Sequence, residues 1–146
     1  MNNEPLNKAE FIKKNGVYMS TPQGNSMRPF IRGGRDSVAM RAFDGRPEKY
    51  DVILYISKDR HVMHRVLKVK NGVCTVRGDN CYYTERVPFD AIMAKMDHIL
   101  KDGKRVVRQT AGMRLLIALW RYAYPVRYCL HQVKRAFGAV VRRAKK

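Results

Sequence analysis

Residues 51–77 read DVILYISKDRHVMHRVLKVKNGVCTVR. The apolar residues of 51–57 and the alternation of apolar and polar residues in 61–70 predict two β-strands joined by a short turn. Asn71-Gly72 follows directly, and this pair is the strongest sequence signal for a two-residue hairpin turn, because both positions take a positive φ. A third strand is therefore expected at 73–76.

Further short strands are expected on both sides of this region. The segments 17–21 and 37–42 precede it, the second of them after the turn residues Gly33-Gly34, and 91–100 follows it as a closing strand. Many short strands separated by glycine-containing turns are typical of small barrels and sandwiches. The predicted fold is all-β, with a compact, barrel-like body.

The C-terminal part of the chain has a different hydrophobic period. Its apolar residues recur mostly every three or four positions, as they do in the stripe of an amphipathic helix. They are Val126, Cys129, Leu130, Val133, Phe137, Val140 and Val141. The segment 113–124 is a second helix candidate, rich in aromatic residues, and Pro125 separates or kinks the two. The sequence thus predicts a helical arm at 1–15, a β domain at 16–103 and a basic amphipathic helical tail at 104–146.

The net charge of +18 is distributed unevenly along the chain. Residues 104–146 contain 12 Lys and Arg residues and no Asp or Glu, whereas the first 103 residues hold the other 18 basic residues and all 12 acidic ones. A segment of this charge is expected to bind a polyanion, either an anionic membrane or a nucleic acid. The most apolar run, 115–120, is far shorter than the roughly 20 residues that cross a bilayer, so no membrane span is expected.

The cysteines bear on the compartment and on metal binding. Cys74, Cys81 and Cys129 are odd in number and have no CxxC spacing. They argue against a disulfide framework and against a zinc site, and they favour a reducing compartment. We therefore expect a cytoplasmic location and neither a metal nor an organic cofactor.

Three residues of the kind that activates a nucleophile lie in separate predicted turns and strands. Ser26 lies in the turn Gly24-Asn25-Ser26-Met27-Arg28-Pro29, His64 in the strand 61–70, and Asp79 in the turn Gly78-Asp79-Asn80. A serine hydroxyl becomes nucleophilic when an imidazole accepts its proton, and a carboxylate behind the imidazole fixes the tautomer. Each residue also has a structural interpretation: Ser26 and Asp79 as turn formers, and His64 as a core histidine.

The order of these motifs resembles that of the signal peptidase I and LexA-like serine peptidases. The resemblance covers residues 16–100 and includes, besides the turns with Ser26 and Asp79, the motifs Tyr50-Asp51-Val52-Ile53-Leu54-Tyr55 and His64-Arg65-Val66. Bacterial signal peptidases have a lysine before the arginine, where this chain has His64. The chain is therefore similar to the archaeal and endoplasmic-reticulum branch, which uses serine and histidine.

The resemblance implies an all-β serine peptidase with Ser26 as nucleophile and His64 as general base. Asp79 is then the candidate third member. Gly24 and Asn25 allow backbone N–H groups near Ser26 to approach a developing oxyanion, so Gly24, Asn25 and Ser26 form the candidate oxyanion hole. Many signal peptidases have a serine two residues before the nucleophile, where this chain has Gly24.

Arginine and aromatic residues of the tail are the candidates for membrane contact. Aromatic rings lie at the depth of the lipid headgroups, and the long basic side chains reach the phosphates. The candidates are Arg114, Trp120, Arg121, Arg127, Lys134 and Arg135. Two alternatives stay open: the apolar stripe packs on the β body, or the charges bind nucleic acid, which an apolar face disfavours.

These features together predict a serine endopeptidase that matures a peptide or protein precursor in the cytoplasm, at the inner leaflet of a membrane. The extended substrate would add to a strand edge beside the nucleophile. The alternatives are a self-cleaving LexA-like regulator and a non-catalytic adaptor whose basic tail binds membrane or nucleic acid. The sequence indicates no oligomeric state.

Overall fold

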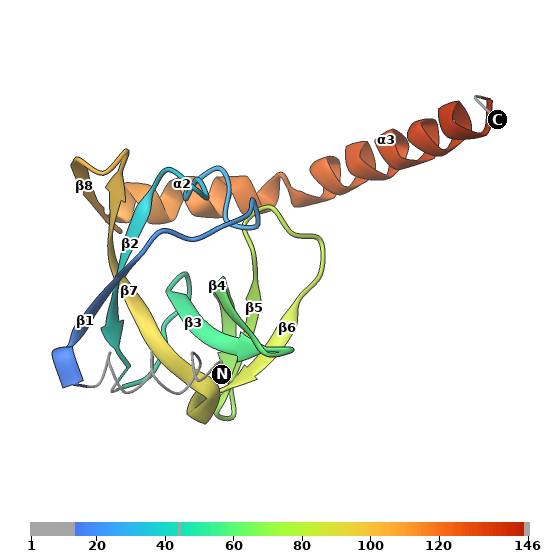
Figure 1. The fold of residues 1–146 in the computed structure, drawn as a ribbon. Helices are drawn as coiled ribbons and strands as arrows, with labels where there is room; N and C mark the ends of the chain where they lie inside the picture. Colours follow the sequence, from blue (N-terminus) through green and yellow to red (C-terminus); the bar gives the residue numbers. More distant parts are fainter. Residues whose placement is uncertain (1–13, 44, 145–146) are drawn as a thin grey trace. The chain divides into compact units, whose positions relative to one another are not determined.

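The computed structural model describes residues 14–43 and 45–144 of the chain. Within this range an antiparallel sheet of eight strands is followed by two α-helices (Figure 1). The chain divides between Gln109 and Thr110 into two compact units, a sheet unit and a helical unit. The helical arm expected at 1–15 lies, except for its last two residues, outside the described range.

The strands follow the predicted pattern closely, with two additions. They are β1 (Val17–Ser20), β2 (Ser37–Ala42), β3 (Val52–Ser57), β4 (Arg60–Lys70), β5 (Val73–Arg77), β6 (Glu85–Pro88), β7 (Ile92–Lys101) and β8 (Arg105–Arg108), with the short 3-10 helix η1 (Phe89–Ala91) before β7. The six strands expected from the sequence are confirmed to within one residue at each end. β6 and β8 were not expected.

Turn residues account for the two hairpins at the centre of the sheet. Asn71 and Gly72 have φ values of 50° and 73°, and Lys58 and Asp59 have 50° and 58°. Two consecutive positive φ values are the geometry of the type I′ turn, whose twist matches that of the flanking strands. The hairpin predicted at Asn71-Gly72 is confirmed.

The prediction of an all-β, barrel-like protein is wrong. The chain is mixed α/β, with 25% helix, and its sheet is open. The strands lie in the order β1-β2-β7-β3-β4-β5-β6, with β8 paired to β7, so β1 and β6 are the two ends. A closed barrel needs a continuous ladder around the whole ring. Here the end strands have only four residues each, and the β4–β5 ladder covers only part of β4.

A bulge in β4 decides which part of that strand stays unpaired. The register shifts between Val66 and Lys68, so Leu67 is the extra residue. β5 pairs with positions 65–70, whereas β3 pairs with positions 60–65. In the described sheet, residues 60–64 therefore have a strand neighbour on the β3 side and none on the other.

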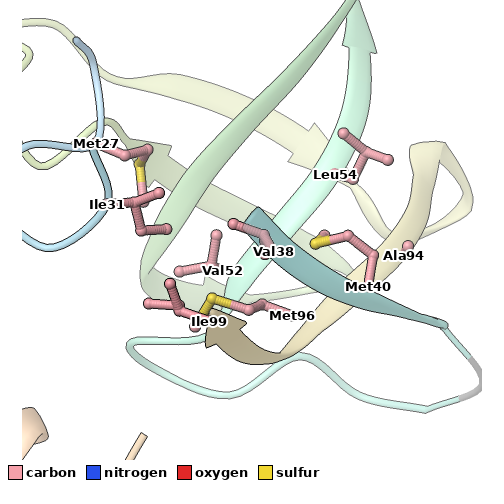
Figure 2. Close-up of a cluster of buried hydrophobic side chains, with 9 residues drawn as sticks. All are labelled: Met27, Ile31, Val38, Met40, Val52, Leu54, Ala94, Met96 and Ile99. Atoms are coloured by element: carbon pink, nitrogen blue, oxygen red, sulfur yellow. The ribbon is translucent and has the colours of Figure 1, made fainter. Parts of the chain in front are cut away.

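The core consists of two apolar clusters on the two faces of β3. Val52 and Leu54 belong to the first cluster, whereas Ile53 and Tyr55 belong to the second. Figure 2 shows the first cluster, in which two residues of the loop before β2 join residues of the strands. Its members are Met27, Ile31, Val38, Met40, Val52, Leu54, Ala94, Met96 and Ile99. Burial on both faces explains why β3 is nearly continuous in apolar residues.

An ion pair attaches the loop before β2 to β7. The buried carboxylate of Asp36 accepts hydrogen bonds from Lys101 Nζ at 2.7 Å and from the Arg32 N–H at 2.8 Å. Lys101 also donates to the Phe30 carbonyl. Burial alone would raise the pKa of Asp36, but the hydrogen bonds from Lys101 and Arg32 lower it well below its ordinary value. The charged pair holds the loop that carries Ser26.

The helical unit contains α2 (Ala111–Tyr122) and α3 (Tyr124–Ala144). The Thr110 hydroxyl caps α2 by accepting from the Met113 N–H at 3.3 Å. Pro125 lies in the first turn of α3, where a backbone N–H is not required. Among the described helices, none is long and apolar enough to cross a membrane. β8 lies in the range assigned to the tail from the sequence, but it belongs to the sheet unit.

Candidate active site

Ser26 lies in the turn between β1 and β2, and its neighbours hold that turn in place. Met27, the next residue, is buried in the first cluster. The Arg28 N–H donates to the Asn25 carbonyl at 3.2 Å, and the Ile31 N–H donates to the Met27 carbonyl at 3.0 Å. Ser26 itself is half-buried and lines a cleft. Its position is therefore set by the packing of the residue that follows it.

His64 lies on β4, on the face that carries the second cluster, and its side chain is 2% exposed. Its Nδ1 is 2.9 Å from the Tyr55 hydroxyl, on the neighbouring strand β3. Glu85, at the start of β6, places Oε1 3.5 Å from the same Nδ1. Two groups that sequence analysis did not single out thus surround the imidazole nitrogen that faces away from Ser26.

The groups around Nδ1 favour one imidazole tautomer. An ionised carboxylate such as Glu85, 3.5 Å from Nδ1, only accepts hydrogen bonds, whereas the Tyr55 hydroxyl at 2.9 Å accepts as well as donates. Both neighbours are therefore compatible with a proton on Nδ1. This leaves the lone pair on Nε2, which is the nitrogen a general base needs.

Gly78 shows how close Nε2 comes to the Ser26 backbone. A Cβ added to Gly78 would lie 3.1 Å from His64 Nε2 and 2.7 Å from the Ser26 carbonyl oxygen. The Asn80 N–H donates to that same carbonyl at 2.7 Å. The turn after β5 therefore holds the Ser26 backbone beside the imidazole, and only a residue without a side chain fits between them.

Burial sets the protonation state of His64. Desolvation lowers its pKa below the ordinary value, and the charges of Glu85 and Asp79 oppose that shift only in part. The imidazole is therefore neutral at pH 7 and able to accept a proton.

Asp79 is held by Arg65. Its two carboxylate oxygens accept from Arg65 Nε and Nη2, both at 2.7 Å, and both side chains are buried. Arg65 also donates from Nη1 to the Tyr50 carbonyl at 2.9 Å. The carboxylate in contact with Nδ1 of His64 is Glu85, and Asp79 acts on the imidazole through its charge. The pairing with Arg65 indicates that Asp79 fixes the turn next to Ser26.

The candidate oxyanion residues form the bend before Ser26. Gly24 has a φ of 88°, which an L-residue rarely adopts, and its carbonyl lies 2.0 Å from where a Cβ on Gly33 would be. Gly24 and Ser26 line the cleft, whereas Asn25 is exposed and its carbonyl is hydrogen-bonded to Arg28. Their role as N–H donors to an oxyanion stays a prediction.

The cleft beside Ser26 and His64 has a volume of about 1000 Å³. One side is formed by β1 and the loop that follows it, and the other by the β3–β4 turn and the first residues of β4. Apolar side chains of the first cluster form much of its lining, among them Met27, Ile31 and Leu54. Because β1 is an edge strand and 60–64 has an unpaired side, two strand edges border the cleft.

The tail residues expected to contact a membrane all lie on the helical unit. Arg114, Trp120 and Arg121 are on α2, and Arg127, Lys134 and Arg135 are on α3. The Arg127 guanidinium lies 3.7 Å from the centroid of the Trp120 ring, which joins the end of α2 to the first turn of α3.

Comparison with known proteins gives no assignment. No protein-family model matches the chain, and a search of curated proteins finds no match. Among the residues that the structure describes, no group of three His, Cys, Asp or Glu side chains is placed to hold a metal ion.

Substituting Gly78 tests the contact between the turn and Ser26. In Gly78→Ala the added methyl would lie 2.7 Å from both the Cys81 thiol and the Ser26 carbonyl and 3.1 Å from His64 Nε2, so the Ser26 backbone and the imidazole are expected to shift relative to each other. A displacement of about 1 Å lowers kcat roughly 100-fold. Gly45→Ala is the matched control, because its Cβ meets nothing within 4 Å. Full peptidase activity in Gly78→Ala would show that this close approach is not required.

Proposed function

We propose that the chain is a serine endopeptidase in which Ser26 is the nucleophile and His64 the general base. The arrangement around Gly78 carries this proposal, because it brings the Ser26 backbone and Nε2 of a neutral, buried His64 to one point. Both residues line the same cleft.

The residues present suit the steps of acyl transfer. Ser26 Oγ attacks the peptide carbonyl while His64 Nε2 accepts its proton, and the resulting imidazolium returns that proton to the leaving amine. Tyr55 and Glu85 are positioning residues: they hold Nδ1–H, and the Glu85 charge stabilises the imidazolium. Water then attacks the acyl carbon while Nε2 accepts its proton, and the imidazolium returns that proton to Ser26 Oγ as the acyl group leaves as a carboxylic acid.

The cleft favours an extended peptide as substrate. A strand inserted beside Ser26 would hydrogen-bond to β1, the end strand of the described sheet, to residues 60–64 of β4, with which β5 does not pair, or to both. The apolar lining favours apolar side chains on the face of the peptide that points inward. This supports a peptide or protein precursor as the partner.

Free cysteines support a cytoplasmic location for the reaction. Cys74, Cys81 and Cys129 are all unpaired as thiols in the structure, as expected where thiols stay reduced. We place the enzyme at the inner leaflet because of its basic C-terminal segment. The alternative of a non-catalytic adaptor keeps the same tail but needs no reactive serine.

A serine-directed fluorophosphonate tests the proposal directly. This reagent modifies serines whose proton is taken by a neighbouring base. We expect one adduct, on Ser26, located by mass spectrometry of a digest of the full-length protein, and no adduct in His64→Gln. Modification of Ser57 in place of Ser26 would exclude Ser26 as the nucleophile, since Ser57 also lines the cleft. Undiminished labelling in His64→Gln would exclude His64 as the general base.

The pH dependence of that labelling reports the state of His64. Only the neutral imidazole accepts a proton, so the rate rises with pH through the His64 pKa and is flat above it. Since burial lowers this pKa, the midpoint should lie below about 6.5, the value for free histidine. Glu85 raises the pKa, so Glu85→Gln should move the midpoint further down. A midpoint above 6.5 would contradict the burial argument.

A further inference from the structure

The α3 helix carries an exposed apolar stripe. Its members recur at helical spacing and are Val126 (64% exposed), Leu130 (57%), Val133 (60%) and Phe137 (71%). On α2, Leu115, Leu119 and Tyr122 form a second exposed series at the same spacing. Contiguous apolar surface of this kind marks a site of interaction.

The positive charge of the helical unit indicates the kind of partner that it binds. From Thr110 to the end of the sequence there is no Asp or Glu, and the exposed Lys134 lies on α3 beside the stripe, whereas the exposed Arg135 lies on the opposite face of the helix. A second copy of this unit would bring like charges together, which opposes self-association. An anionic surface with an apolar interior complements both features, and a nucleic acid complements only the charge.

Aromatic residues gather where the two helices meet. The rings of Tyr124 and Tyr128 are stacked, with centroids 6.0 Å apart, and Trp120 lies under the Arg127 guanidinium. Tyr122, at the end of α2, is 85% exposed. Tyr, Trp and Arg are the side chains that reside at the headgroup level of a bilayer, because each has an apolar body and a polar end.

We infer that the helical unit is a membrane-binding module that lies in the plane of an anionic bilayer. The α3 stripe enters the boundary between headgroups and acyl chains, and Lys134, beside the stripe, contacts lipid phosphates. This function is independent of the chemistry at Ser26, since no residue of the cleft contributes to it.

Co-sedimentation of the full-length protein with vesicles tests the inference. The probes are vesicles of phosphatidylcholine alone and of phosphatidylcholine with phosphatidylglycerol. We expect strong binding to the anionic vesicles and weak binding to the neutral ones. Lys134→Gln should lower the affinity about fivefold. Leu130→Asp should lower it at least about tenfold more than Gln132→Asp, which adds the same charge to the same helix outside the stripe.

Several results would overturn the inference. Equal binding to neutral and anionic vesicles would exclude lipid charge as the determinant. Equal affinity of the Leu130→Asp and Gln132→Asp proteins would exclude the stripe. Binding to duplex DNA that exceeds binding to vesicles, or a dimer without lipid that Leu130→Asp dissociates, would assign the unit to a nucleic acid or to a second copy. The far-UV circular dichroism spectrum and the urea unfolding midpoint of each variant serve as the fold control.

Discussion

Replacing Ser26 by alanine is expected to abolish peptide cleavage, with kcat lower by about 10⁶-fold, as found when a catalytic serine is removed. The reason is chemical: alanine has no oxygen to form the acyl intermediate, and His64 then has no proton to accept. His64→Gln should lower kcat by a similar factor, and the double variant should lower it little further, because the two residues act as one unit.

Cleavage is measured first on a mixture of synthetic peptides, analysed by mass spectrometry, and then on a fluorogenic form of the best substrate. Ser57→Ala is the matched control, since Ser57 also lines the cleft but lies at the end of β3. We expect its kcat to be unchanged. Cleavage that persists in Ser26→Ala would favour a different nucleophile. Absence of cleavage by the unaltered protein as well would favour the adaptor alternative.

Asp79→Ala is expected to lower the free energy of unfolding by about 3–5 kcal/mol, the usual cost of removing one partner of a buried ion pair. Arg65 is 1% exposed and is held at two nitrogens by Asp79. Without the carboxylate its charge is buried and uncompensated. Urea unfolding measures the effect, and the double variant Arg65→Met/Asp79→Leu should recover much of the loss, because it removes both charges.

Two further variants separate the structural role of Asp79 from a catalytic one. Asp90→Ala, at an exposed carboxylate, should change stability by less than about 0.5 kcal/mol. Asp79→Asn keeps the shape of the side chain, and its kcat should fall less than tenfold, whereas an asparagine in place of a triad aspartate costs about 10⁴-fold. A loss of that size in Asp79→Asn would restore Asp79 as the third catalytic member.

Local signals accounted for the hairpins. Asn71-Gly72 was predicted because the preference for positive φ belongs to the residues themselves. β6 and β8 were missed because Glu85–Pro88 and Arg105–Arg108 have weak strand patterns of their own. They become strands by pairing with β5 and β7. The open sheet could not be predicted either, because it depends on how far the paired strands run, and β5 ends at Arg77, opposite Arg65, before it reaches the first residues of β4.

The candidate site was predicted only in part, because local motifs can be read from the sequence whereas contacts that depend on strand pairing cannot. Ser26 and His64 were singled out because each belongs to a short motif of consecutive residues, and both residues line one cleft although 38 positions separate them. Tyr55 and Glu85 were missed because their contact with His64 depends on the β3–β4 register and on the position of β6. Arg65 stands next to His64, so strand alternation places it on the opposite face, but no local signal shows that Asp79 is its partner.

The amino-acid order by itself determined the strands with strong alternation, the two-residue turns, the helical period of the C-terminal segment and its charge, since each depends on residues a few positions apart. Tertiary structure alone decided that the sheet stays open, that Glu85 rather than Asp79 contacts His64, and that Gly78 lies between the imidazole and Ser26. Those outcomes depend on strand pairing and burial, which bring together residues far apart along the chain and cannot be read from any short stretch of it.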